Sequence, residues 1–139
     1  MMVKNEIIEK YVGQPYKHNG RNEYLDCLGL IISFLSEHGI KLPEDDGRVI
    51  EKEWYKKDPR RLIRGLKEYA AVNIPANKLR PLDVVVFEFE GIPRHMGVMI
   101  SRSKFIHARE NKKVAVIRLK HYKRFLHSCW RVKGGEIDE

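Results

Sequence analysis

The sequence predicts an α+β fold, with helices in the first half of the chain and an antiparallel sheet in the second. Up to about residue 71 the apolar residues recur at helical spacing, whereas from Leu79 onward the period becomes that of extended strands. The extended half consists of short β-rich runs separated by turn residues, which is typical of antiparallel hairpins. Helices followed by strands indicate segregated layers rather than alternating βαβ units.

Two helices are expected near the N-terminus. Residues 3–12 place their apolar side chains on one face of a helix, and Gly13 follows as a stop. The next helix begins after Asp26, a good N-cap residue, and ends before Gly39. It is apolar on almost every face, which is typical of a helix buried in the middle of a domain. Cys27 is the first residue of this central helix.

A charged helical insert is expected at about residues 45–70. Within it Asp58 suits an N-cap and Pro59 suits the first helical position. The side chains expected to face the core from this helix are Leu62, Leu66 and Tyr69.

The second half of the chain predicts a series of antiparallel strands. Residues 84–89 begin as a continuous apolar run, as expected for a buried central strand. After a loop at 90–94, a hairpin is expected around residues 101–103, followed by two more strands. The expected ranges are 95–100 and 104–108 for the hairpin, 114–119 for a further strand, and 128–133 for the closing strand, with 121–125 ambiguous.

Composition favours a single soluble domain covering residues 1–139. Charged residues make up 33% of the chain and hydrophobic residues 42%, with a formal net charge of +8. The lysines and arginines are spread along the chain with acids between them, and they are interpreted as solvated surface. No nucleic-acid motif is present, so no nucleic-acid partner is expected.

No apolar run suits a secretory signal or membrane insertion, so synthesis in the cytoplasm is expected. Two distant cysteines make no disulfide framework, and no Cys/His spacing suits zinc.

Cys27 is the candidate nucleophile. A cysteine at the N-terminus of a helix lies at the positive end of the helix dipole, which favours the thiolate. The alternative is that Cys27 is a small core residue, because unpaired cysteines are among the most buried residue types. Cys129, beside Trp130 on the closing strand, is expected to be inert core.

A nucleophilic thiol needs a base and a group that orients the base, and the hairpin supplies two histidines. If its loop is residues 101–103, Ile100 faces Lys104 and Gly97 faces His107. His95 and His107 then lie on the same face as diagonal neighbours, and Gly97 leaves room for one imidazole to lean toward the other. A loop of even length would send the two rings to opposite faces.

These residues match the motifs of a known family. The chain resembles the NlpC-type cell-wall cysteine peptidases, whose motifs include "G-x-x-Y", "D-C-S-G", "P-G-D-L-V-F-F", "H-V-G-I-Y-I" and "F-I-H-A". The matching segments, in the same order and at similar spacing, are residues 13–16, 26–30, 81–87, 95–100 and 105–108.

The resemblance implies a papain-like core and a division of roles. Cys27 would be the nucleophile, His95 the general base and His107 the residue that orients His95. Tyr16 matches a tyrosine whose hydroxyl helps to polarise the scissile carbonyl, beside the backbone N–H of Cys27. Members typically hydrolyse amide bonds in peptidoglycan stem peptides, through a thioester acyl-enzyme and without a metal or other cofactor.

Three positions depart from the family pattern. Leu28 replaces the serine after the nucleophile, Leu82 stands where glycine is common, and Asn19 replaces one glycine of a pair. None removes a catalytic group, but Leu28 alters the wall beside the nucleophile. The candidate substrate-binding residues are Asp26, Leu28 and Trp54.

The lone domain without a signal peptide resembles members encoded with bacteriophage tail genes. Delivery to the cell wall in a virion is therefore expected, with phage tail components as candidate partners. Two other interpretations stay open: a catalytically idle tail or wall-binding module of the same fold, and an acyltransferase that uses the same nucleophile.

Overall fold

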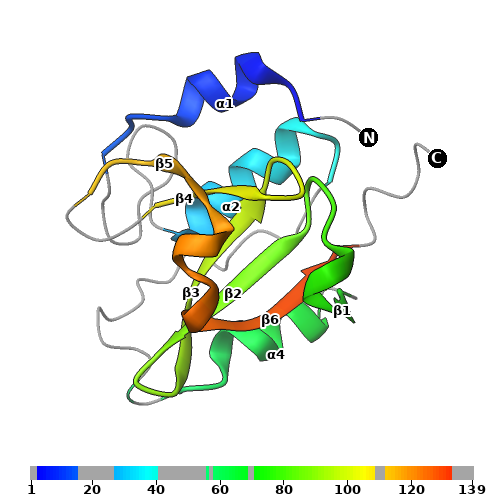
Figure 1. The fold of residues 1–139 in the computed structure, drawn as a ribbon, viewed down its shortest axis with the longest axis vertical. Coiled ribbons are helices and arrows are strands. Elements are labelled where there is room, and N and C mark those ends of the chain that lie inside the picture. The colour runs from blue at the N-terminus through cyan, green and yellow to red at the C-terminus, as the bar shows by residue number, and fades with distance from the viewer. Residues whose placement is uncertain are drawn as a thin grey trace.

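The computed structural model contains helices that pack beside a six-stranded antiparallel sheet, which confirms the α+β prediction (Figure 1). The structure describes residues 3–15, 27–40, 56, 58–68, 71–108 and 112–132, apart from the side chains of residues 27, 28 and 68. Most of the predicted insert at about 45–70, including Tyr69, lies outside these residues.

The central helix is buried as its composition predicts. Helix α2 (Cys27–Glu37) packs between α1 (Asn5–Tyr11) and the sheet, where it contacts strand β3 (Figure 1). Its core residues Leu30, Ile31, Phe34 and Leu35 are at most 1% exposed. Gly39 ends the helix with φ +83°, and the Ile40 N–H donates to the Leu35 carbonyl in a Schellman-type cap. Helix α4 (Arg61–Glu68) also packs on β3 and buries Leu62 and Leu66.

The sheet has the strand order β1-β6-β2-β3-β4-β5, and all its pairs are antiparallel. The bounds are Val72–Ile74 for β1, Val84–Phe89 for β2, Ile92–Met99 for β3, Lys104–His107 for β4, Ala115–Arg118 for β5 and Leu126–Arg131 for β6. The short 3₁₀ turns are η1 (Ala76–Lys78), η2 (Leu119–His121) and η3 (Lys123–Phe125).

The sheet separates two core clusters because successive residues of a strand point to opposite faces. On β2, Val84 and Val86 pack in the first cluster, together with the apolar side chains of α2. Val85 and Phe87 pack in the second, which also contains Met99, Phe105 and Tyr122. The central strand is therefore buried on both faces, as its continuous apolar run predicts.

Several element boundaries differ from the predictions. The loop expected at 90–94 is a two-residue turn, because Glu90 and Gly91 both have positive φ, as a type I′ hairpin requires. Strand β1 was not predicted, since three residues are too short to show alternation. Strand β6 begins at Leu126, two residues earlier than expected, and thus includes the exposed His127.

Helix α4 begins at Arg61, after a turn formed by residues 59 and 60, rather than at Pro59. The Asp58 carbonyl accepts a hydrogen bond from the Arg61 N–H, and the Asp58 carboxylate pairs with the Arg64 guanidinium. Asp58 therefore starts this segment through its side chain and its carbonyl together, one turn before the regular helix.

Leu82 occupies a backbone conformation that usually belongs to glycine. It has φ +75°, and the Asp83 N–H donates to the Arg80 carbonyl, so residues 80–83 form a turn with a positive φ at its third position. The Leu82 side chain is 4% exposed and packs in the first core cluster. Burial of this side chain offsets the cost of the left-handed backbone, which explains how leucine replaces the glycine expected from the family pattern.

Candidate active site

The β3–β4 hairpin has the register that the sequence predicts. Val98 pairs with Ile106 and Met99 with Phe105, and the Ile100 N–H donates to the Lys104 carbonyl over 2.9 Å. The loop is therefore residues 101–103, and continuing the same register places Gly97 opposite His107. Because the loop has an odd number of residues, residues 95 and 107 point to the same face of the sheet.

The two imidazoles meet on that face. Nε2 of His95 lies 2.8 Å from Nδ1 of His107, a hydrogen-bond distance, and the ring centroids are 5.1 Å apart. Both side chains are buried, with residue exposures of 8% and 2%. A hydrogen bond between buried groups is strengthened electrostatically by its low-dielectric surroundings, so the pair is held in one relative orientation.

Aromatic rings enclose the pair. The His95 ring lies beside Phe87, with centroids 5.9 Å apart, while His107 contacts Phe105 at 4.9 Å and Tyr122 at 5.3 Å. The two contacts of His107 are edge-to-face, with interplanar angles of 66° and 81°, and this packing restricts rotation of the His107 ring. Sequence reasoning missed Tyr122, because it lies between two 3₁₀ turns, in the segment whose periodicity is ambiguous.

Gly97 has a different role from the predicted one. The space above it is filled by the Phe105 ring rather than by an imidazole, since a Cβ at Gly97 would lie 2.6 Å from Cδ2 of Phe105. Gly97 therefore admits Phe105 against the sheet, and Phe105 in turn supports His107.

The predicted nucleophile is the first residue of α2, and α2 packs on the strand that carries His95. The apolar side chains of α2 enter the first core cluster, whereas the imidazoles lie on the face of the second. The Cys27 side chain lies outside the described part of the structure, as do Tyr16, Asp26, Trp54 and the side chain of Leu28.

The second cysteine is buried in the sheet. Cys129 lies on β6 in the second core cluster and is 2% exposed. Burial, followed by the negative charge of Asp83, raises the pKa of the Cys129 thiol to about 11. Cys129 is therefore protonated near neutral pH and is a poor nucleophile.

No group of three His, Cys, Asp or Glu side chains suited to a metal ion occurs within the residues that the structure describes. Over the same ranges, no helix is long and apolar enough to cross a lipid bilayer.

Comparison with known families identifies the fold. Residues 13–131 match the model of the NlpC/P60 family, which covers most of the chain and includes both histidines. The chain belongs to the NlpC/P60 family. A comparison with curated proteins finds no match.

Solved structures of NlpC/P60 proteins share the fold. A family member from Bacillus cereus ATCC 10987 is 21% identical with a TM-score of 0.64, over 92% of this chain and 39% of that one. A similar-to-lipoprotein NLP/P60 family protein from Staphylococcus aureus is 20% identical with a TM-score of 0.60, over 95% of this chain and 43% of that one. The NlpC/p60 domain of the peptidoglycan hydrolase SagA is 17% identical with a TM-score of 0.59, over 90% of this chain and 95% of that domain.

These identities are low, so the likeness to the solved structures concerns the fold. The chain spans about two fifths of the length of the first two proteins.

Proposed function

We propose that this NlpC/P60 chain is a cysteine peptidase that hydrolyses amide bonds in peptidoglycan stem peptides. The observation that carries the proposal is the buried imidazole pair, with His95 Nε2 2.8 Å from His107 Nδ1; His95 lies on β3, the strand that packs against the helix beginning at Cys27. Family membership and the likeness to the SagA domain, described as part of a peptidoglycan hydrolase, support the choice of substrate.

The hydrogen bond between the imidazoles determines which nitrogen acts as the base. When His95 donates its Nε2–H to Nδ1 of His107, the lone pair of His95 is on Nδ1. Nδ1 then accepts the Cys27 thiol proton, and the resulting imidazolium keeps a charge-assisted hydrogen bond to His107. His107 is thus a positioning residue that selects the reactive tautomer of His95.

The proposed reaction has two stages within a papain-like arrangement. The Cys27 thiolate attacks the scissile carbonyl carbon, and the leaving amine takes the proton held by His95 as the C–N bond breaks. Water, deprotonated by His95, then attacks the thioester, releasing the acid and restoring the thiol. The backbone N–H of Cys27 and the hydroxyl of Tyr16 are the proposed donors to the oxyanion.

The remaining assignments are proposals of the same kind. Asp26, Leu28 and Trp54 are proposed to contact the stem peptide. The chain is proposed to act as a single domain, and the reaction is proposed to need no metal or other cofactor. Delivery in a phage virion, among tail components, would bring the chain to the wall after synthesis in the cytoplasm.

Digestion of defined stem peptides tests this function. The wild-type chain is incubated with peptides containing D-glutamate linked to a diamino acid, and the fragments are weighed by mass spectrometry. We expect a newly released amine, no product from Cys27→Ala, and full activity from Cys129→Ala as the matched control. Release only when an acceptor amine is added would indicate an acyltransferase, and no turnover by the wild type would favour an idle module.

A further inference from the structure

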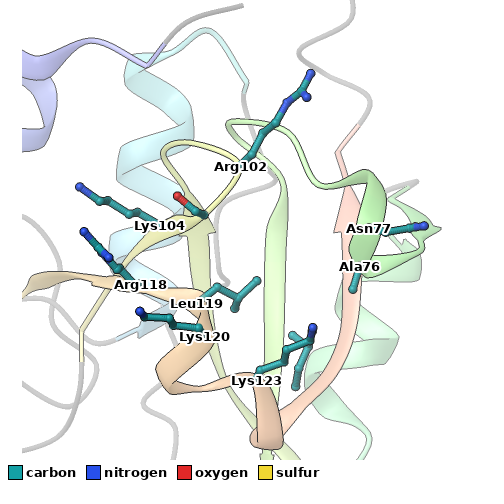
Figure 2. A pocket seen from close by; sticks show the side chains of 10 residues that line it. Ala76, Asn77, Arg102, Lys104, Arg118, Leu119, Lys120 and Lys123 are labelled. Carbon is teal, nitrogen blue, oxygen red and sulfur yellow. The ribbon is translucent and has the colours of Figure 1, made fainter.

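A basic hollow lies at the end of the sheet where β4 begins. Its volume is about 670 Å³, and it is bounded by the β3–β4 loop, the end of β5, both 3₁₀ turns that follow, η1 and the start of β6 (Figure 2). The lining residues that carry charge are Arg102, Lys104, Arg118, Lys120 and Lys123. Because Lys104 begins β4 and His107 ends it, the hollow lies about 10 Å along the strand from the imidazole pair.

The charge of this hollow has no compensation within the part of the chain that the structure describes. All five of its cationic residues are exposed, and none of them forms an ion pair there. Residues 111–135 contain eight Lys or Arg and no Asp or Glu. The expectation that cations are spread among acids is therefore wrong for this stretch, which contributes most of the local positive charge.

The arrangement of the cations is unfavourable for an isolated surface. Lys104 and Arg118 are directly opposite each other on β4 and β5, and like charges in that relation destabilise a sheet. Lys120 follows two residues later, and Figure 2 shows all three side chains extending in the same direction along one flank of the hollow, away from Leu119 and Lys123. An anion bound between them would relieve this repulsion.

The backbone under the cations is held in place. The Leu119 N–H donates to the Ser103 carbonyl over 2.8 Å, which joins the start of η2 to the β3–β4 loop. The Ser101 hydroxyl accepts hydrogen bonds from the N–H groups of Ser103 and Lys104, at 3.2 and 3.1 Å. The backbone that carries these cations is therefore preorganised, which lowers the cost of ordering it around a ligand.

We propose that the basic hollow binds the phosphodiester backbone of an anionic cell-wall polymer, of the poly(glycerol phosphate) type. The choice of a wall polymer rests on the proposed function, which places the chain at a cell wall. The lining contains no aromatic side chain, whereas binding of single-stranded nucleic acid relies on aromatic platforms for base stacking. Several cations on different elements suit a chain of phosphates better than one isolated phosphate.

Binding of end-labelled poly(glycerol phosphate) to the full chain tests the proposal. The test variant is Lys104→Gln, Arg118→Gln and Lys120→Gln together. The control variant combines Arg60→Gln, Arg61→Gln and Lys67→Gln. It removes the same amount of charge from three exposed residues, two within α4 and one directly before it. Between about 50 and 200 mM salt we expect the test variant to lose about tenfold or more in affinity and its log–log salt slope to fall by about 3. The control should change affinity by less than about twofold.

Three results would overturn the proposal: equal losses in the two variants, no saturable binding by the wild type, or tighter binding of poly(dT) at equal phosphate concentration. Each variant is also assayed on a short stem peptide without phosphate. Failure of every chain, wild type included, to hydrolyse that peptide would refute the proposed function without bearing on the binding measurement.

Discussion

Replacing Gly97 with alanine tests how the sheet positions the imidazole pair. The added Cβ would lie 2.6 Å from Cδ2 of Phe105 and 3.0 Å from the carbonyl oxygen of Ile106. To return to ordinary van der Waals contact at 3.4 Å, the Phe105 ring has to move by about 0.8 Å. Phe105 is fully buried, so we expect Gly97→Ala to lower the free energy of unfolding by about 1–3 kcal/mol.

The same displacement reaches the site, because the Phe105 ring packs on His107. If His107 moves by the full amount, the nitrogen–nitrogen distance to His95 grows from 2.8 Å to about 3.6 Å, which is no longer a hydrogen bond. A misplacement of about 1 Å can reduce a catalytic rate by about 100-fold, and we expect a loss of that order in stem-peptide hydrolysis.

Urea unfolding and stem-peptide hydrolysis measure the two effects separately. Gly65→Ala is the matched control, since a Cβ at Gly65 meets nothing within 4 Å in the interior of α4. That change should stabilise the chain by about 0.5–1 kcal/mol and leave hydrolysis unchanged. Unaltered stability in Gly97→Ala would refute the close packing of Phe105, and normal hydrolysis in a destabilised Gly97→Ala would refute its support of His107.

Three further predictions concern stability. Leu82→Gly should be more stable to urea than Leu82→Ala by about 1 kcal/mol, because both variants lose the buried side chain but only glycine relieves the cost of the positive φ. A Leu82→Ala variant that is the more stable of the two would contradict this prediction. Asp83→Asn should lower the free energy of unfolding by about 3 kcal/mol, since it breaks the bidentate pair with Arg131 at 2.9 and 2.8 Å; a loss below about 1 kcal/mol would show that the pair is dispensable. The pKa of Cys129 is raised to about 11 in the folded chain and is about 8.5 when unfolded, so its contribution to stability is complete below about pH 8.5 and is lost toward pH 11. Cys129→Ala should flatten the decline in unfolding free energy across that window, and identical pH profiles would contradict the shift.

The hairpin that carries the histidines could be predicted because its register depends only on the number of residues in its loop. A loop of residues 101–103 and the two-residue alternation of strands determine which side chains share a face. The burial of α2 could be predicted from the apolar composition of the helix itself. Its end could be predicted from Gly39, because glycine tolerates the positive φ found there.

Features that depend on distant segments could not be predicted. Strand β1 forms because Val72–Ile74 pairs with β6, more than fifty residues later, and three residues carry no periodic signal of their own. The contact of Phe105 with Gly97 depends on packing across two strands, so the sequence indicated a small residue but not which ring fills the space. The basic hollow likewise forms from segments that are separated in the chain.

The most direct test of the proposed site is the rate at which iodoacetamide alkylates Cys27 near neutral pH, compared between the wild type and His95→Ala by peptide mass spectrometry. Cys129, buried and protonated, is the internal reference. We expect fast alkylation of Cys27 in the wild type, about tenfold or more slower alkylation in His95→Ala, and slow alkylation of Cys129 in both. Equal, slow alkylation of the two cysteines, or a Cys27 rate unaffected by His95→Ala, would contradict it.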